Sequence, residues 1–555
     1  MLLGAACGDA LGWPQEPRGG LVGGQRARDA LTPDAQFRSW TRTAGNYRSR
    51  YRDPVRAGEY SDDTQLLLAT ARCCLHGDHW WEHLVEVELP VWLIYQRGGG
   101  GAVLRAAASW AARTPPWIAA GGRRGMATTE KYRAAGANGV AMRIAPHAVY
   151  ASGPRDLVKR VIRDGLATHG HPRALVGAVA YAQALAHALR SEAVLGYGEL
   201  LGVVENGLVR AADVVELLPH DWGSADQVEE FGDTWTATNK EMYELLAQID
   251  KSLRRGSLSS PDETLTELGC RDPHISGAGT VSAAGALYLA SRFAARPVTG
   301  VVTAAFLRGA DTDTLASMTA GLLGALHGYE WLGEMASSVQ DATYLGEISR
   351  ALSTEPYQRP LPRVRPNPIV SRRLILEQLY SAEVGKQGEF PDQRLYRIVD
   401  VEQLERDRLR TRLHLNDGQT VVVDVRSDTA DSRAATMRKS EVTDNRDVDK
   451  RSQLIEVTLL TRRIDAGVDF YAKLLDKDLP IRSDVLEVLP GLKIRQVRDS
   501  EPVGPLEITL AVCDPEAAVG RTGSPIIRAS ADDGSVATED PDGRLIVLKP
   551  IPRDA

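Results

Sequence analysis

Two short clusters of oxygen-bearing side chains lie far apart in the sequence and could hold a cation together. The first reads SDDTQ at residues 61–65, and the second reads DTDT at 311–314. Each cluster precedes a run rich in alanine and leucine, so each predicts a helix N-terminus, where such side chains accept hydrogen bonds from backbone N–H groups. Capping alone explains either cluster taken singly. If the fold brings them together, they offer carboxylates and hydroxyls without Cys or His, which suits Mg²⁺, Mn²⁺ or Ca²⁺ and argues against zinc.

A calcium-binding EF-hand loop is excluded for the second cluster. Counting from Asp311, the position that requires glycine holds Ala316, and the position of the bidentate glutamate holds Leu322.

The composition indicates an ordinary globular protein. The chain has 555 residues, of which 43% are hydrophobic and 25% charged, and this length predicts two or more domains. The net charge of −7 excludes a global basic field that would draw the protein to nucleic acid or anionic lipid. The five scattered cysteines argue against a disulfide framework, and we expect a reducing cytoplasm. The short apolar N-terminus contains Asp9 and predicts neither a signal peptide nor a membrane span.

The segment before the first cluster adds two more carboxylates. Residues 2–12 (LLGAACGDALG) predict a helix of small residues that buries Asp9, which must then cap a neighbouring turn or support the cation site from behind. Glu16 follows on a loop and gains interest only if it faces the clusters. Residues 17–60 show no clean periodicity and are rich in glycine, arginine and aromatic residues. A solvated insertion is the favoured interpretation, and phosphate or base binding is the alternative.

Residues 61–352 predict helix after helix, with three breaks of possible functional interest. Four glycines at 98–101 precede a helix and could expose N–H groups to a phosphate. A tight turn at 136–143 (GANGVAMR) also leads into a helix. The stretch THGHP at 168–172 holds two histidines, for which hydrogen bonding is favoured over metal binding. Glycine runs are more often plain turns, so none of these three segments identifies a binding site by itself.

A change in composition predicts the domain boundary. Residues 1–354 are expected to form an all-α domain, 355–368 (with five prolines) a linker, and 369–555 a β-rich α+β domain. In the last part, Asn416-Asp417-Gly418 predicts a hairpin turn between two strands. Helical patterns occur near 371–384 and 468–477, and dense mixed charge at 427–453 predicts an exposed loop.

The motifs GDALG…E, SDDTQ, GANGVAMR, THGHP and GADTDT occur in that order and resemble those of the ADP-ribosylglycohydrolase family over about residues 1–350. The resemblance implies an all-α fold with a binuclear Mg²⁺ centre, or Mn²⁺ in some members, at the base of a cleft for ADP-ribose. It implies metal ligation by six residues: Ser61, Asp62, Asp63, Asp311, Asp313 and Thr314. It also implies substrate contacts by Gly98, Gly99, Gly100, Asn138, Gly139 and His169. Ser61 replaces a common threonine, and Gly309-Ala310 replaces a common glycine pair.

The same resemblance implies hydrolysis that removes ADP-ribose from a modified acceptor at the anomeric carbon of the distal ribose. Glu16 is then the candidate general acid/base, with Asp62 and Asp313 as catalytic metal ligands. The acceptor expected is a protein side chain, arginine before serine, or a nucleic acid. The alternative is a non-catalytic ADP-ribose-binding, immunity or adaptor protein acting through residues 369–555. The intact set of carboxylates favours the enzyme, because uncompensated buried charges are costly. Nucleic-acid binding by residues 369–555 is the poorer hypothesis, because no basic stripe is present.

Overall fold

The computed structural model describes residues 1–46, 49–119, 122–192, 194–208, 211–354, 368–380, 382–405 and 408–426. Farther along the chain it describes the strands between 457 and 550, with residues 519 and 526. The chain divides into two compact units, Met1–Ser440 and Glu441–Ala555. Each unit is described by itself.

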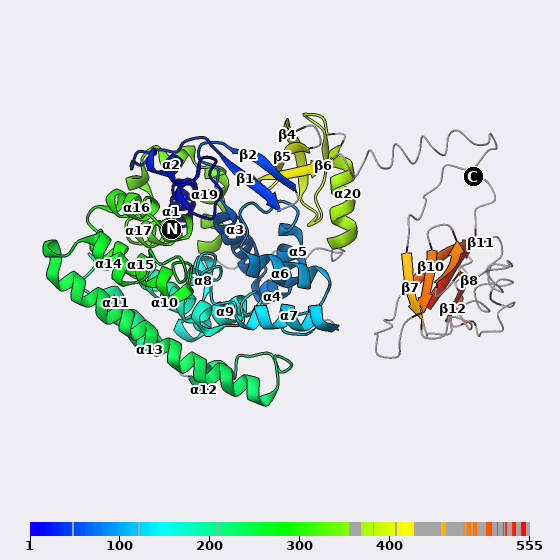
Figure 1. Ribbon diagram of the computed structural model, residues 1–555, viewed down its shortest axis with the longest axis horizontal. Coiled ribbons are helices and arrows are strands. Elements are labelled where there is room, and N and C mark those ends of the chain that lie inside the picture. Colours follow the sequence, from blue (N-terminus) through cyan, green and yellow to red (C-terminus); the bar gives the residue numbers. More distant parts are fainter. Residues whose placement is uncertain are drawn as a thin grey trace. The chain divides into compact units, whose positions relative to one another are not determined.

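Helices dominate the first unit (Figure 1). They are α1 (Leu2–Gly12), α2 (Gly24–Asp29), α3 (Asp62–Cys74), α4 (Trp80–His83), α5 (Leu89–Trp92), α6 (Gly101–Ala111), α7 (Gly122–Arg133), α8 (Ala145–Tyr150), α9 (Pro154–Leu166), α10 (Pro172–Arg190), α11 (Glu199–Gly207), α12 (Ala211–Val215), α13 (Ala225–Arg255), α14 (Pro261–Glu267), α15 (Gly279–Arg292), α16 (Pro297–Ala305), α17 (Thr312–His327), α18 (Met335–Ser338), α19 (Ala342–Ser353) and α20 (Pro368–Tyr380). A single π-helical turn, Leu84–Glu88, joins α4 to α5. The predicted helices after both oxygen-rich clusters are confirmed as α3 and α17.

Among the described residues, the first unit also holds two antiparallel sheets. One is the hairpin of β1 (Trp40–Asn46) and β2 (Ser49–Val55). The other has the order β3-β4-β5-β6, formed by β3 (Gln387–Glu389), β4 (Leu395–Glu405), β5 (Arg408–Leu415) and β6 (Thr420–Arg426). The predicted turn between β5 and β6 is confirmed, and Gly418 there has a φ of +102°, which favours glycine. The description of this part as all-α is therefore only partly right.

The described strands of the second unit form two small four-stranded sheets, as its β-rich composition predicts. Their orders are β7-β10-β9-β8 and β11-β14-β13-β12, and each combines parallel and antiparallel pairs. The strands are β7 (Val457–Thr461), β8 (Ile481–Arg482), β9 (Val485–Leu489), β10 (Leu492–Gln496), β11 (Glu507–Val512), β12 (Arg528–Ala529), β13 (Val536–Glu539) and β14 (Leu545–Pro550). The predicted helix at 468–477 and the predicted loop at 427–453 lie outside the described residues.

The compact division differs from the predicted boundary at 355–368. Residues 355–367 lie outside the described part, and Pro368 begins α20. The first unit extends to Ser440, so α20 and β3–β6 belong with the helices. The reason is a shared core: Ile375, Leu379 and Phe390 are buried in one apolar cluster with Leu89 and Trp92. A proline-rich stretch marks a change in composition here, but not the end of the packed unit.

The described residues between 17 and 60 include a helix and a hairpin, so this stretch is not an element-free insertion. Helix α2 is followed by the β1–β2 hairpin, which lies beside β4, β5 and β6 (Figure 1). Alternation along the hairpin is obscured in the sequence because its arginines occupy partly covered as well as exposed positions. Arg42, for example, is mostly covered and pairs with the buried Asp53.

Helices α1 and α17 approach so closely that only glycine fits between them. A Cβ atom on Gly4, Gly8 or Gly12 would lie 2.4, 2.2 or 2.2 Å from a backbone carbonyl oxygen of α17. The hydroxyl of Thr312 donates to the carbonyl oxygen of Gly12 at 2.9 Å. This contact fixes the N-terminus of α17 against the C-terminal end of α1.

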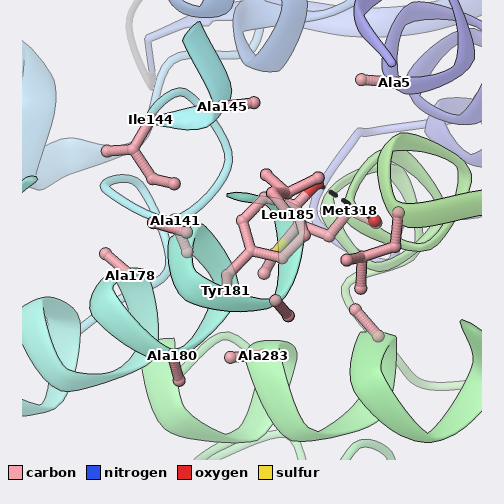
Figure 2. Packing of buried hydrophobic residues seen from close by; sticks show 14 of the residues in the cluster. Ala5, Ala141, Ile144, Ala145, Ala178, Ala180, Tyr181, Leu185, Ala283 and Met318 are labelled. Carbon is pink, nitrogen blue, oxygen red and sulfur yellow. Dashed lines mark hydrogen bonds between the residues drawn. The ribbon is translucent and has the colours of Figure 1, made fainter. Parts of the chain in front are cut away.

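The core around these helices is built mainly from alanine and leucine. Figure 2 shows Tyr181 and Leu185 of α10 close to Met318 of α17, and Ala180 of α10 beside Ala283 of α15. The hydroxyl of Tyr181, buried in this core, donates to the carbonyl oxygen of Met318 at 3.1 Å, as buried polar groups require (Figure 2). Among the helices within the described residues, none combines the length and apolar character needed to cross a membrane.

Candidate active site

The two oxygen-rich clusters line the same cavity, which has a volume of about 900 Å³. Asp62 and Asp63 reach it from the first turn of α3, and Asp311, Asp313 and Thr314 reach it from the start of α17. Ser61 is buried immediately beside them as the N-cap of α3. Segments separated by about 250 residues in the sequence thus meet at two helix N-termini, where the helix dipoles favour negative charge.

At α3, capping is done by residues other than the two aspartates. The Ser61 hydroxyl accepts from the Asp63 N–H at 3.2 Å. The buried Asp9 carboxylate accepts from the N–H groups of Ser61 and Thr64 at 3.1 and 3.0 Å, and from the Thr64 hydroxyl at 2.6 Å. Asp9 therefore braces the turn from behind. Asp62 and Asp63 remain available to the cavity, and the buried Oδ2 of Asp63 has no hydrogen-bond partner among the described residues.

At α17, the carboxylates are oriented by backbone and amide donors. The N–H of Thr314 donates to Oδ1 of Asp313 at 2.9 Å. The side-chain amide of Asn138 donates to Oδ2 of Asp311 at 3.1 Å and to the Ser282 hydroxyl at 3.0 Å. Asn138 thus orients a carboxylate of the site, in addition to lining the cavity.

Glu16 reaches the same carboxylates from the turn that follows α1. It comes directly after the 3₁₀ turn Trp13–Gln15 and lines the cavity. Glu16, Asp311 and Asp313 each place one carboxylate oxygen within 4.8 Å of the others, a spacing that could hold a metal ion. Desolvation, followed by the charges of Asp311 and Asp62, raises the pKa of Glu16 to about 8.

The aspartates raise the pKa values of one another. Burial, and then the charge of Asp9, raises the pKa of Asp62 to about 7 and that of Asp63 well above its usual range. Burial and the charges of Glu16 and Asp311 do the same for Asp313. Such a cluster is unfavourable unless a cation or protons neutralise it.

The donor set fits a divalent metal ion. All these side chains offer oxygen atoms as metal ligands. The buried Oδ2 of Asp63 has no hydrogen-bond partner among the described residues, so it is able to bind a cation. Asp62, Asp63, Asp311 and Asp313 would hold the metal, with Ser61, Thr314 and Glu16 adjacent to them.

The glycine run at 98–101 borders the carboxylates directly. Gly98 has a φ of +96°, and a Cβ atom there would lie 2.9 Å from Oδ1 of Asp62. A Cβ atom on Gly99 would lie 2.7 Å from the Trp92 ring, whereas Gly100 faces open space. All three line the cavity, and the run then enters α6. Glycine is needed at 98 for both its conformation and its closeness to Asp62.

The turn at 138–139 and His169 lie together on another part of the cavity lining. A Cβ atom on Gly139 would lie 3.0 Å from the His169 ring, and the buried Arg143 donates to the Gly139 carbonyl oxygen. Burial, and then the charge of Arg143, lowers the pKa of His169 to about 3, so its imidazole is neutral at neutral pH. By contrast, His171 accepts from the Arg173 N–H at 3.0 Å and caps α10, which confirms a hydrogen-bonding role.

Several cavity-lining residues were not predicted. Arg42 and Tyr51 come from the hairpin, in the segment where substrate contact was the less favoured interpretation. Arg372, Arg408, Val422 and Asp424 come from α20, β5 and β6. The interleaving of arginine and aromatic residues at 17–60 was a usable signal for the first group. The sequence gives no comparable signal for the second group, because the position of these residues depends on long-range packing.

The fold and site together define a helical protein with a carboxylate-lined centre in a cavity of about 900 Å³. The chain belongs to the ADP-ribosylglycohydrolase family, whose model matches residues 1–361. Members of this family are typically metal-dependent glycohydrolases. Among solved structures, an ADP-ribosylglycohydrolase-related protein complex is 20% identical, with a TM-score of 0.38, covering 64% of this chain and 96% of that one. Comparison with curated proteins gives no match.

Proposed function

We propose that the protein is a Mg²⁺-dependent hydrolase that removes ADP-ribose from a modified protein side chain or nucleic acid, by hydrolysis at the anomeric carbon of the distal ribose. The observation that carries this proposal is the meeting of α3 and α17, whose first turns direct four aspartates into one cavity opposite Glu16. Family membership supports the hydrolytic reaction.

The residues have separate roles in metal binding and substrate binding. Asp62, Asp63, Asp311 and Asp313 hold Mg²⁺, or Mn²⁺ in its place, and two ions would balance their charges. When bound, the metal orients the ribose hydroxyls and polarises water. Gly98–Gly100, the 138–139 turn and His169 bind the rest of ADP-ribose, where neutral His169 can accept or donate a hydrogen bond.

Glu16 is the proposed proton-transfer group. Its carboxyl lies within 4.8 Å of carboxylate oxygens of Asp311 and Asp313, and this closeness supports a role beside the metal. Departure of the acceptor from the anomeric carbon leaves positive charge on the sugar, which nearby carboxylates stabilise. Glu16 would protonate the leaving acceptor and then take a proton from the attacking water.

The test is release of ADP-ribose from arginine-, serine- and DNA-linked substrates, with Mg²⁺ or with EDTA. We expect release only with the metal, and its loss in Asp62→Ala and Asp313→Ala. Glu16→Ala should lower turnover by ~10² or more while ADP-ribose still binds. Binding without any release from these substrates would instead favour the non-catalytic alternative. Equal Mg²⁺ affinity but slow turnover in Glu16→Gln would separate proton transfer from metal ligation, since both fit the position of Glu16.

A further inference from the structure

Arg143 and Thr168 belong to two of the sequence motifs, but neither side chain lines the cavity. Arg143 ends the motif GANGVAMR, and Thr168 begins the motif THGHP. Both are buried, with exposed fractions of 0% and 1%. Each forms a hydrogen bond with a residue that does line the cavity, namely Gly139 and His169. Both can therefore act on a bound substrate without touching it.

The guanidinium group of Arg143 connects the turn at Gly139 to the segment that leads into His169. One of its terminal nitrogens donates to the carbonyl oxygen of Gly139. The other donates to the carbonyl oxygen of Asp164 at 3.0 Å and to the hydroxyl of Thr168 at 2.9 Å. Its Nε donates to Oδ1 of Asp164 at 2.8 Å. Because one rigid, planar group forms all these bonds, it fixes the two cavity-lining segments relative to each other.

Asp164 is held from its other side as well, so Arg143 has a fixed orientation. Oδ2 of Asp164 accepts from Nε2 of His147 at 3.0 Å, and Nδ1 of His147 lies 3.5 Å from Sγ of Cys74. Each of these four side chains is 0% exposed. A buried polar network whose members are bonded to one another holds a single arrangement, because breaking one bond leaves a buried group without its partner.

The hydroxyl of Thr168 connects Arg143 to His169. Its oxygen accepts from Arg143 and lies 2.7 Å from Nδ1 of His169. The single hydroxyl proton can point to this Nδ1 or to the carbonyl oxygen of Gly165, which is 3.5 Å away. The shorter distance favours Nδ1. The charge of Arg143 favours it too, because a hydroxyl that accepts from a cation becomes a stronger donor.

His169 then presents an N–H group to the cavity. Its imidazole is neutral, since burial and then the charge of Arg143 lower its pKa to about 3. A neutral imidazole carries one proton, so a ring that accepts at Nδ1 has its proton on Nε2. A Cβ atom on Gly139 would lie 3.3 Å from this Nε2, so glycine leaves room for a ligand beside it. The hydrogen bond at one ring nitrogen determines what the other offers.

We propose that Arg143 and Thr168 are positioning residues that hold His169 in the form that donates, through Nε2–H, to an oxygen atom of bound ADP-ribose. A donor suits this ligand, because the oxygens of its diphosphate and ribose groups accept hydrogen bonds. The other form of the ring would direct a lone pair at the same oxygens. The inference rests on the proposed function, which supplies ADP-ribose as the ligand.

The first test observes the proton on His169 by NMR, in the full chain labelled with ¹⁵N at its histidines. The signals of His169 are identified by their absence in His169→Ala. We expect the proton on Nε2 in the wild type and in Thr168→Ser, which keeps the hydroxyl. Thr168→Val removes the hydroxyl and should give a mixture of both forms. A proton on Nδ1 in the wild type, or an unchanged ring in Thr168→Val, would overturn the proposal.

The second test measures the affinity for ADP-ribose by calorimetry with Mg²⁺. We expect Thr168→Val to weaken binding about tenfold and Thr168→Ser to recover most of the loss. Arg143→Lys keeps the charge but loses the fork, so it should weaken binding as well. The matched control is Thr70→Val, since Thr70 is buried in α3 and its hydroxyl has no partner among the described residues. It should bind like the wild type, and thermal unfolding confirms that each variant folds.

A double variant separates positioning from a general structural effect. If Thr168 acts through His169, Thr168→Val should cause no further loss of affinity when His169→Ala is already present. Losses that add in the double variant, or wild-type affinity in Thr168→Val, would overturn the proposal. The ring is observed without ligand, so the first test holds even if no substrate is hydrolysed. A wild-type protein that does not bind ADP-ribose would instead contradict the proposed function.

Discussion

Asp63 is a buried carboxylate that is repelled by the neighbouring aspartates. Its Oδ2 is buried without a partner among the described residues, and the charges of Asp9, Asp62 and Asp311 surround it. We predict that Asp63→Asn unfolds at a higher temperature than the wild type in EDTA, because one repelling charge is removed. The same variant should gain much less stability from Mg²⁺, because a ligand is lost. Thermal unfolding with EDTA and with Mg²⁺ measures both effects.

Asp9→Ala is the matched control for this prediction. Asp9 accepts hydrogen bonds from Ser61 and Thr64 and holds the turn rather than facing the cavity. Its loss should lower the unfolding temperature in both buffers, because the donors at the start of α3 lose their acceptor. We expect the free energy of unfolding to fall by about 1–3 kcal/mol. An undiminished stabilisation of Asp63→Asn by Mg²⁺ would remove Asp63 from the metal site.

At the scale of elements, the close contact of α1 with α17 makes glycine necessary at position 8. A Cβ atom there would meet the Ala316 carbonyl oxygen at 2.2 Å and the backbone N of Ser317 at 2.8 Å. We predict that Gly8→Ala costs about 1–3 kcal/mol or more, as overpacking does in rigid cores. Gly202→Ala on α11, where nothing lies within 4 Å, should be neutral or slightly stabilising. Urea unfolding of the two variants compares the same chemical change in different surroundings, and equal stabilities would contradict the packing argument.

Some helices and turns could be predicted from the sequence alone, and others could not. Helices α3 and α17, with their capping and carboxylate residues, were predictable because a cap and the run behind it are local signals. The turn at Asn416-Asp417-Gly418 was predictable for the same reason. The hairpin β1–β2 was not, because its buried Asp53 pairs with Arg42 in the same hairpin and with arginines as distant as Arg410. No local pattern encodes a partner more than 350 residues away.

At the scale of the whole first unit, the charge network around Asp53 should make stability fall in acid. Although burial opposes ionisation, the charges of Arg97, Arg42 and Arg410 hold the pKa of Asp53 well below its usual range. A depressed carboxyl pKa contributes stability that is present above the unfolded value, near 4, and is lost as pH falls toward the folded value. We predict that Asp53→Asn is less stable than the wild type at pH 7, by about 3–5 kcal/mol, because buried guanidinium groups lose their partner.

The same variant should lose less of its remaining stability than the wild type does between about pH 5 and pH 3, because Asn does not titrate. Urea unfolding across this range gives the two slopes. Asp250→Asn is a suitable control, since Asp250 pairs with the exposed Arg254 four residues away on α13. Parallel slopes for wild type and Asp53→Asn would show that the network does not govern the acid response.

The extent of the first unit leads to a prediction about fragments. A chain ending at residue 361, where the family match ends, lacks α20 and β3–β6. It would expose the apolar surface that contains Leu89 and Trp92, and it would leave Glu59 and Asp53 without Arg412 and Arg410. We predict that fragment 1–361 is largely insoluble or unfolds at a much lower temperature than fragment 1–440, because both the apolar burial and the ion pairs are lost.

Fragment 1–440 should keep the unfolding temperature of the first unit and its full affinity for ADP-ribose, since every described cavity residue lies before residue 427. Sedimentation, thermal unfolding and calorimetry on the two fragments make the comparison. A soluble fragment 1–361 with the stability of 1–440 would show that the sheet is dispensable for folding, and normal ADP-ribose affinity in it would show that residues 368–426 do not contribute to ADP-ribose binding. Because the sheet supplies both core residues and cavity residues, folding and binding should instead be lost together.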